Sequence, residues 1–206
     1  MGRTPTNAKA KLIEMAADLI WKSSYGSVSV DDICKNSGVN KGSFYYYFSS
    51  KAELAVAVME ASYQSYEIEM LEVFSDSVSA VERFERLLDF IYNKQKESSE
   101  KYGHVCGCPF ASLGSEMAGN EELIRAKADE IFSRQEHILL KTLKELVSIG
   151  KLHTDTDLSA KSTEIHIFIM GQVMMARIQN DLTNLKNDMR SGLFRIININ
   201  KPSTLA

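Results

Sequence analysis

Hydrophobic residues recur three or four positions apart along most of the chain. In residues 8–23, for example, Leu12, Ala16 and Ile20 recur every four positions, with Lys9 and Glu14 among the polar residues outside that stripe. This spacing places the apolar side chains on one face of a helix. It predicts helices over residues 8–23, 51–74, 78–98, 110–118, from about 120 to a stop at Gly150, 158–179 and 183–197. In residues 51–74 the stripe expected to be buried includes Leu54, Val58, Ala61, Ile68 and Leu71. No strand-like alternation persists, so we predict an all-α fold of about nine helices, the other two being short.

Residues 29–40 contain the signals that begin and end a short helix. Ser29, with Asp32 three positions later, forms a variant of the capping box that starts a helix. Gly38 then supplies a residue that adopts positive φ easily, which is common just after a helix end. Asn40 has a side chain suited to cap a second helix. The stretch therefore predicts a helix, a tight turn and the start of another helix.

The second short helix and its successor are defined by residues 44–53. Phe44 and Phe48 are spaced i, i+4 and are expected to be buried. Ser50 and Glu53 have the spacing of a full capping box for a third helix that begins at Lys51. Two helices joined by a glycine turn are the arrangement that lets the second one enter the major groove of DNA.

Three consecutive tyrosines, Tyr45, Tyr46 and Tyr47, follow Phe44. Successive residues step around a helix, so the three rings cannot all share the buried face. At least one must be exposed. Core packing explains Phe44 and Phe48, whereas an exposed tyrosine favours contact with DNA, and we expect this of Tyr46 in particular.

The segment GVNKGSFYYYF at residues 38–48 resembles the DNA-binding signature of TetR/AcrR-type transcriptional regulators. The match covers roughly residues 8–58, about a quarter of the chain, and its further positions are Ala16, Leu19, Ile20, Trp21, Tyr25, Gly26, Val30, Ile33, Cys34, Ser50, Lys51 and Leu54. The resemblance implies that Lys41, Gly42, Ser43 and Tyr45 face base edges. It also implies that Tyr46, Tyr47 and Lys51 contact phosphates. Ser29 lies at the start of the first short helix, as Lys51 does at the start of the third, and is likewise expected to contact a phosphate.

The resemblance further implies a helix-turn-helix DNA-binding domain over residues 1–50 and an effector-binding and dimerisation domain over 51–206. The two C-terminal helices would pair with those of a second copy, and residues 165–178 are apolar around much of their circumference. The partners expected are a palindromic double-stranded operator and a small apolar or aromatic effector. Candidate residues lining the effector pocket are Phe84, Leu88, Tyr92, Phe110, Phe132, Ile169 and Met170.

Charge is unevenly distributed along the chain, whose formal net charge is −3. Residues 1–51 contain seven Lys or Arg and four Asp or Glu, whereas the remainder contains seventeen and twenty-three. A basic N-terminal segment (residues 1–51, called the head) and an acidic remainder (called the body) suit a DNA-binding protein. No apolar run of membrane-spanning length occurs and the N-terminus does not resemble a signal peptide, so we expect a cytoplasmic protein.

The segment around His104, Cys106 and Cys108 is the one chemically suggestive feature outside the head. Metal binding is one reading, but zinc motifs space their cysteines further apart and need another ligand pair. A second interpretation is a thiol sensor of oxidants or electrophiles that uses Cys106 and Cys108. It gives the alternative function, a redox-sensing repressor. We favour a third, in which small thiols precede a helix that begins near Pro109. No metal or cofactor is expected.

Other functional classes fit the sequence less well. The chain contains no HExxH, GxSxG, P-loop or dinucleotide-binding motif, which argues against an enzyme. A purely protein-binding helical module would not need a tyrosine-rich recognition helix. We therefore predict a ligand-responsive DNA-binding regulator that acts as a homodimeric repressor, with an activator as the nearest variant.

Overall fold

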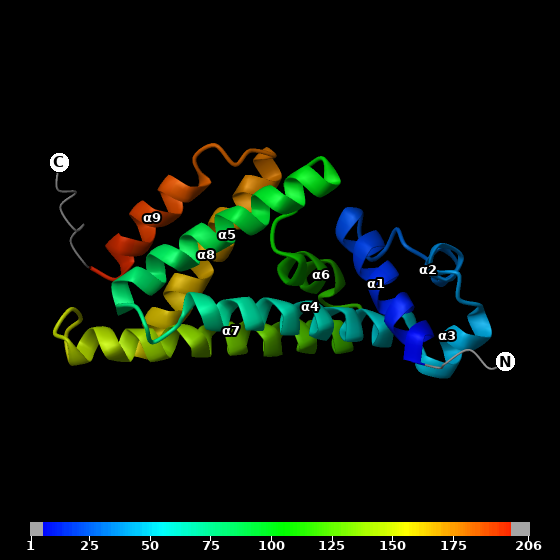
Figure 1. Ribbon diagram of the computed structural model, residues 1–206, viewed down its shortest axis with the longest axis horizontal. Helices are drawn as coiled ribbons and strands as arrows, with labels where there is room; N and C mark the ends of the chain where they lie inside the picture. The colour runs from blue at the N-terminus through cyan, green and yellow to red at the C-terminus, as the bar shows by residue number, and fades with distance from the viewer. Residues whose placement is uncertain (1–5, 199–206) are drawn as a thin grey trace. The chain divides into compact units, whose positions relative to one another are not determined.

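The computed structural model describes residues 6–198 of the chain (Figure 1). Within that range the secondary structure is entirely α-helical, which confirms the all-α prediction. The N-terminal segment that does not resemble a signal peptide includes residues 1–5, which lie outside the described range. The helices are α1 (Thr6–Lys22), α2 (Val30–Ser37), α3 (Lys41–Tyr47), α4 (Lys51–Val73), α5 (Ala80–Tyr102), α6 (Pro109–Met117), α7 (Glu122–Ser148), α8 (Leu158–Gln179) and α9 (Leu185–Ile196).

The chain folds into two compact units. The first consists of Met1–Glu67 together with Pro109–Ile131, and the second of Ile68–Cys108 together with Phe132–Ala206. This division differs from the functional division expected at residues 50 and 51, because the beginning of α4, the whole of α6 and the beginning of α7 belong to the first unit together with α1, α2 and α3. The first unit is therefore built from two separate stretches of sequence.

In the first unit, α1, α2 and α3 pack on one another as a three-helix head. Its core includes Leu12, Ile33 and Phe44, which are completely buried. Helices α4 and α6 meet through the rings of Tyr63 and Phe110, whose centroids are 6.1 Å apart. The apolar faces predicted for the first helices therefore form the core of this unit.

The buried face of α4 differs from the predicted stripe in its second half. Ile68 and Leu71, which we expected to be buried, are 65% and 68% exposed, whereas Met70 and Phe74 are buried. Tyr63, Met70 and Phe74 fall on one face at the 3.6-residue period, and Ile68 and Leu71 lie well away from it. The prediction was wrong because α4 has apolar residues on more than one face.

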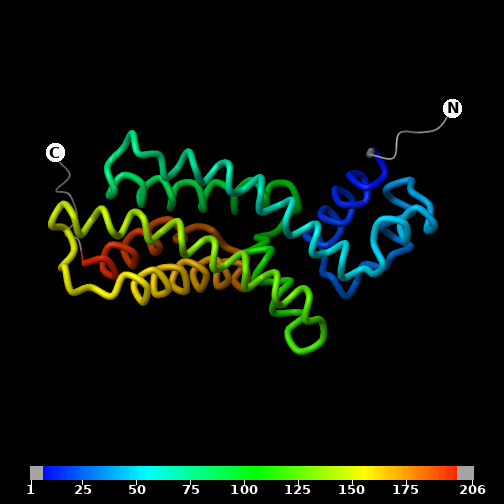
Figure 2. Tube along the Cα trace, turned by 90° about the horizontal axis from the view of Figure 1, so that it is seen from below, coloured from blue at the N-terminus to red at the C-terminus, as the bar shows by residue number. Residues whose placement is uncertain are grey.

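In the second unit, α8 and α9 lie side by side and run in opposite directions (Figures 1 and 2). Gly192 of α9 is buried and faces the ring of Phe168 on α8. A Cβ atom at Gly192 would lie only 2.0 Å from Cζ of Phe168, which no real contact allows. The absence of a side chain at Gly192 therefore lets the two helices pack closely.

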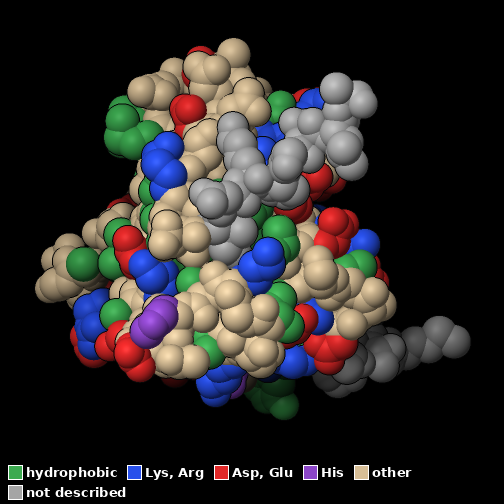
Figure 3. All heavy atoms as spheres, turned by 90° about the vertical axis from the view of Figure 1, so that its left-hand side faces the viewer, with side chains coloured by type: hydrophobic (Ala, Val, Ile, Leu, Met, Phe, Trp, Pro, Cys, Tyr) green, Lys and Arg blue, Asp and Glu red, His purple; other side chains and the backbone are tan. Residues whose placement is uncertain are grey.

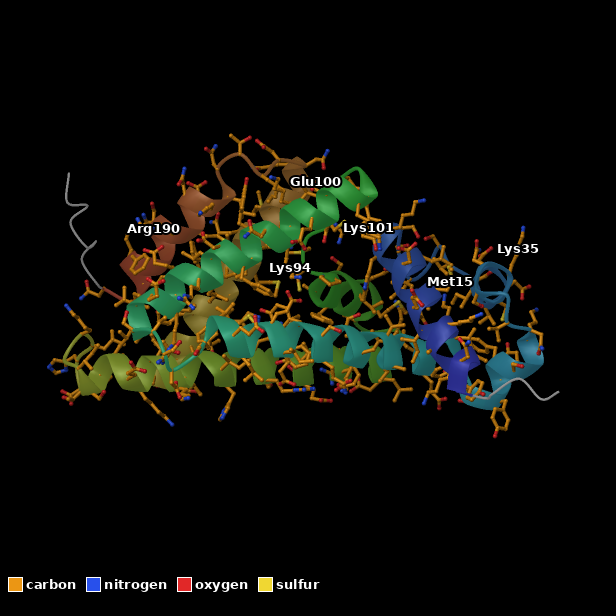
Figure 4. All side chains as sticks on the ribbon, viewed as in Figure 1. Met15, Lys35, Lys94, Glu100, Lys101 and Arg190 are labelled. Atoms are coloured by element: carbon orange, nitrogen blue, oxygen red, sulfur yellow. The ribbon has the colours of Figure 1, made fainter. Side chains whose placement is uncertain are left out.

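Charged side chains connect the helices of the second unit. Arg83 of α5 is almost completely buried; it pairs with Glu145 of α7 and donates through Nε to the carbonyl oxygen of Ser75, 2.9 Å away. Arg190 of α9, which Figure 4 labels, donates through Nε to both carboxylate oxygens of Glu85 on α5 at 3.0 and 2.9 Å. Because the buried guanidinium of Arg83 is paired, it does not carry the cost of an isolated charge.

No helix in the described part of the chain is long and apolar enough to span a membrane. Figure 3 shows one face of the molecule, on which acidic and basic side chains are interspersed and hydrophobic ones are scattered. The described part of that face therefore has a mixed, charged surface.

Candidate nucleic-acid interface

Helix α2 begins and ends at the residues that the sequence indicated. Ser29 Oγ accepts the N–H of Asp32 at 3.1 Å, and the Asp32 carboxylate accepts the N–H of Ser29 at 2.9 Å, which completes a capping box. Gly38 ends the helix with φ of 67°. Hydrogen bonds from Ser29 hold the pKa of the Asp32 carboxyl below its ordinary value. The predicted boundaries of α2 are confirmed, and the hydroxyl of Ser29 is already engaged within the head.

Helix α3 is held in place by its cap and by two phenylalanines. Asn40 Oδ1 accepts the N–H of Ser43 at 2.8 Å. Phe44 and Phe48 are buried, as predicted, with ring centroids 6.0 Å apart. Gly42 is exposed, and a Cβ there would lie 3.3 Å from the capping oxygen of Asn40. A small residue at this position therefore leaves room for the cap as well as for a close approach to DNA.

The three tyrosines of α3 differ in exposure. Tyr46 is 79% exposed and Tyr45 is 55% exposed, whereas Tyr47 is half-buried. The ring of Tyr45 packs edge-on against Phe44, and the rings of Tyr46 and Tyr47 pack against each other 4.9 Å apart. Large exposed aromatic side chains on so short a helix are what a binding surface needs.

The predicted base-reading residue Lys41 forms an ion pair inside the head. Its Nζ lies 2.6 Å from Oδ1 of Asp31 on α2, and both side chains are largely exposed. The hydrogen bond and charge of Asp31 raise the pKa of Lys41. Exposed ion pairs contribute little to stability, so this one can open at small cost when another anion approaches. Lys35, near the end of α2, projects from the same helix as Asp31 (Figure 4).

The ammonium of Lys51 contacts the turn between α1 and α2. It is half-buried and donates to the carbonyl oxygens of Tyr25 and Val28, both at 2.9 Å. It also lies 3.9 Å from the centroid of the Tyr25 ring. Burial lowers the pKa of Lys51, opposed by the charge of Glu116. The side chain thus supports the turn between α1 and α2, and a contact of Lys51 with a phosphate stays a prediction.

The capping box predicted at the start of α4 forms only in part. Ser50 Oγ accepts the N–H of Glu53 at 3.1 Å, as expected. The Glu53 carboxylate, however, accepts the N–H of Ser49 at 2.8 Å instead of that of Ser50. This bond also holds the pKa of Glu53 below its ordinary value. The side chain reaches one residue further back because the chain is extended at Phe48 before α4 begins.

Comparison with known protein families decides the class of this fold. The model of bacterial regulatory proteins of the tetR family matches residues 12–58, and the model of the tetracyclin repressor-like C-terminal domain matches residues 81–191, more than half of the chain. The chain belongs to the TetR family. Members of this family are DNA-binding transcriptional regulators and not enzymes, so the head formed by α1, α2 and α3 is a helix-turn-helix domain.

Individual TetR-family proteins resemble this chain over most of its length. The transcriptional regulator AcuR of Cereibacter sphaeroides is 29% identical over 174 residues, which cover 84% of this chain and 77% of AcuR. The transcriptional repressor NemR of Escherichia coli K12 is 24% identical over 127 residues, 62% of each protein. A crystal structure of the regulatory protein TetR from Rhodobacter sphaeroides has a TM-score of 0.76 at 26% identity, covering 89% of this chain and 96% of that one.

The candidate pocket residues fall into both units. Phe84, Leu88 and Ile169 are buried in the second unit, and Tyr92, Phe132 and Met170 are half-buried there. Phe110 belongs to the first unit, where its ring contacts Trp21 and Tyr63. The structure therefore gives Phe110 a role in the packing of α6 against α1 and α4.

All three cysteines are free thiols. Burial raises the pKa of Cys106, opposed by the charges of Arg177 and Lys101, and its Sγ lies 4.0 Å from Nε2 of His104. A raised pKa reduces the thiolate fraction on which thiol sensing depends. Cys108 is half-buried, and no group of three potential metal ligands occurs in the described residues. The geometry supports a structural role for this segment better than a sensing one.

Two residues of this region were not singled out by sequence reasoning. Asp31 holds Lys41, and Glu116 of α6 binds the turn between α1 and α2. Asp31 could have been suspected from its position in the first turn of α2, where acidic residues are common. The Glu116 contact joins residues about ninety positions apart, and no local pattern signals it.

Proposed function

We propose that the protein is a homodimeric repressor that binds a palindromic operator through α3 of each copy and is released by a small, uncharged effector. The main support for this DNA-binding surface is that Lys41, Tyr45 and Tyr46 lie on one capped helix and that both tyrosines are more than half exposed. In this proposal Lys41, Ser43 and Tyr45 read bases, while Tyr46 and Tyr47 contact phosphates.

An operator can be obtained by selecting double-stranded DNA from a random library with the full-length protein. Substitution of Lys41 by Ala should then change the preferred sequence, because a lysine in the major groove discriminates between bases. Tyr46→Phe, which removes only the hydroxyl, should weaken binding to all sequences alike. A Lys41→Ala variant that loses the same factor on every sequence would contradict base reading, and failure to select any DNA would contradict the proposed function.

The homodimer is supported by the surface of α8. Ile165, Ile169, Val173 and Ala176 form its buried face, and the exposed side carries a second apolar stripe made of Ile167, Gly171, Met175 and Ile178. Ile178 is 74% exposed in the protomer. An exposed apolar stripe along a helix is typical of an interface, and a palindromic operator requires two heads related by symmetry.

Gly171 provides a discriminating test of the dimer. A Cβ at this position would have no neighbour within 4 Å in the protomer. In a monomer, Gly171→Leu should therefore stabilise α8, since glycine is unfavourable inside a helix. In a dimer the added side chain should separate the two α8 helices and weaken association. Sedimentation velocity of this variant and of Ala126→Leu, an exposed control on α7, would decide; a monomeric wild-type protein would contradict the proposal.

The effector site is proposed among the middle helices of the second unit. Phe132 packs its ring against His166, whose Nδ1 lies 3.3 Å from Oε1 of Glu136. Burial lowers the pKa of His166, opposed by the charge and hydrogen bond of Glu136. Tyr92 and Met170 are also half-buried in the second unit, and side chains of these types favour an uncharged apolar or aromatic molecule with a hydrogen-bonding group.

A thermal-shift screen of small molecules would identify candidate effectors. A true effector should raise the melting temperature of the free protein and reduce its affinity for the operator, because it binds one arrangement of the heads better than the other. Met170→Ala should change the concentration needed for release without changing operator affinity in its absence. A compound that stabilises the protein but leaves DNA binding intact would not qualify.

A further inference from the structure

The turn between α1 and α2 is held by a carboxylate from α6. Oε2 of Glu116 accepts the N–H of Tyr25 at 3.1 Å, and Oε1 accepts the N–H of Gly26 at 2.7 Å. All three residues belong to the first compact unit. Both oxygens of one carboxylate thus bind two successive peptide groups, and hydrogen bonds to a charged acceptor are stronger than those between neutral groups.

The same turn is held from α4 by a positive charge. The ammonium of Lys51 donates to the carbonyl oxygens of Tyr25 and Val28, each at 2.9 Å, and lies against the Tyr25 ring. The N–H of Tyr25 therefore points to an acid from α6 and its carbonyl oxygen to a base from α4. Two helices that do not belong to the three-helix head together fix the orientation of this turn.

Gly26 and Phe110 show that α6 approaches the head closely. A Cβ at Gly26 would lie 3.0 Å from Oε1 of Glu116, the shortest approach that a real contact tolerates. The ring of Phe110 on α6 meets Trp21 of α1 edge-on, with centroids 6.5 Å apart. Helix α6 therefore contacts α1 at Trp21 and the following turn at Gly26, so it is anchored to the head at two points.

We infer that Glu116 is a positioning residue for DNA binding. Three residues separate Gly26 from Val30, the first residue of α2, so the Glu116 bond orients the chain just before Ser29 and the helix that supports α3. When the hydrogen bonds to Glu116 open, the turn becomes more mobile. Affinity for DNA then falls, because the turn has to be ordered during binding. This inference rests on the proposed function.

The test uses the full-length protein and the selected operator. Glu116→Gln retains the size of the side chain but replaces one accepting oxygen by an NH₂ group. We expect operator affinity to fall about three- to tenfold, the loss that corresponds to one ordinary hydrogen bond, because Glu116 is exposed and the Gln side chain can keep the other bond. Amide exchange at Tyr25 and Gly26 should become faster, while the melting temperature changes little. Glu121→Gln, whose carboxylate also acts on Tyr25 through its charge, is the matched control and should leave both properties unchanged.

A second variant reaches the same bond from the other side without altering any charge. Gly26→Ala should displace the carboxylate of Glu116 and reproduce the loss of affinity and the faster exchange. The two substitutions should not be additive, because they remove one interaction. Glu116→Asp, with a shorter side chain, should partly restore affinity in the Gly26→Ala background.

The outcomes separate this inference from the proposed function. If the wild-type protein binds no selected DNA, the proposed function fails. If it binds DNA, and Glu116→Gln or Gly26→Ala binds with equal or greater affinity than the wild type, the positioning role of Glu116 is overturned. Equal losses in Glu116→Gln and Glu121→Gln would also overturn it, since the effect would then come from net charge alone.

Discussion

The DNA-binding head and the α8–α9 pair of the second unit are both helical but are held together differently. In the head, the boundaries of α2 and α3 are set by Ser29, Gly38 and Asn40, each acting on a residue three or four positions away. The α8–α9 pair depends on Gly192 meeting Phe168, a contact between two helices. Local hydrogen bonds at the helix caps therefore define the helices of the head, whereas the α8–α9 pair depends on close packing between residues far apart in the sequence.

Phe44→Ala is expected to have the largest effect and would break the head alone. Removal of a fully buried phenylalanine typically costs about 3–5 kcal/mol. Trp21, the single tryptophan, lies in α1, so its fluorescence should report unfolding of the first unit at lower denaturant concentration. The part of the circular dichroism at 222 nm that comes from the helices of the second unit should persist. Coincident shifts of both signals would show that the two regions unfold as one, and Tyr46→Ala on the same exposed helix is the control.

Gly192→Val should instead damage the second unit. The added side chain overlaps the ring of Phe168, and overpacking of this kind typically costs about 1–3 kcal/mol. We expect earlier loss of helical circular dichroism with little change in the Trp21 transition, and partial recovery when Phe168→Ala is added. Gly171→Ala, where a Cβ meets no neighbour, should be harmless to the protomer. A harmless Gly192→Val would mean that α8 and α9 separate easily.

Ser29→Ala tests whether the head depends on its local polar bonds. Loss of an N-cap side chain costs about 1 kcal/mol, seen as a lower midpoint of the Trp21 transition. Because Ser29 lowers the pKa of Asp32, the ionised carboxylate stabilises the fold above its ordinary titration range, and this contribution is lost as the pH falls through the lowered pKa. The difference between wild type and variant should therefore shrink below about pH 4. A difference that grows in acid would contradict this coupling.

Asp31→Asn should leave stability almost unchanged and alter DNA binding. The ion pair with Lys41 is exposed, so its loss should barely move the unfolding midpoint. Without the acidic side chain, affinity for all DNA should rise and the salt slope should steepen by up to about one. The preference for the operator over random DNA should fall, because Lys41 is no longer held in one position. Asp129→Asn on α7 is the control for net charge.

Oxidation of the thiols is expected to have the smallest effect. The pKa of Cys106 is raised by burial, so diamide should leave operator affinity unchanged, as should Cys106→Ser. Release of the operator by diamide in the wild type, abolished in Cys106→Ser, would instead support the redox-sensing alternative.

The head could be predicted closely because its signals are local. Caps and the i, i+4 pair Phe44 and Phe48 act within one or two turns, so residue spacing is enough to recognise them. The direction of a long side chain is a different matter. Lys51 follows the predicted cap, yet its ammonium reaches the carbonyl oxygens of Tyr25 and Val28, residues that spacing does not bring into view.

The body was less predictable for two physical reasons. Helix α4 carries apolar residues on several faces, so hydrophobic periodicity alone did not reveal that Ile68 and Leu71 would be exposed. In addition, no local sequence pattern marks the residues that have unusual structural roles. Neither the buried Arg83 nor Gly192, which admits the ring of Phe168, stands out without knowledge of the helix that packs against it.

The discontinuity of the first unit bears on the order in which the chain folds during synthesis. Helices α1, α2 and α3 can form their core once α4 has begun to emerge from the ribosome, since their caps and buried phenylalanines are all encoded before it. Phe110 and Glu116 emerge much later, after the whole of α5. Before α6 emerges, the α1–α2 turn can form its own hydrogen bonds between Ser24 and Ser27 and those from Lys51, but not the two that Glu116 accepts.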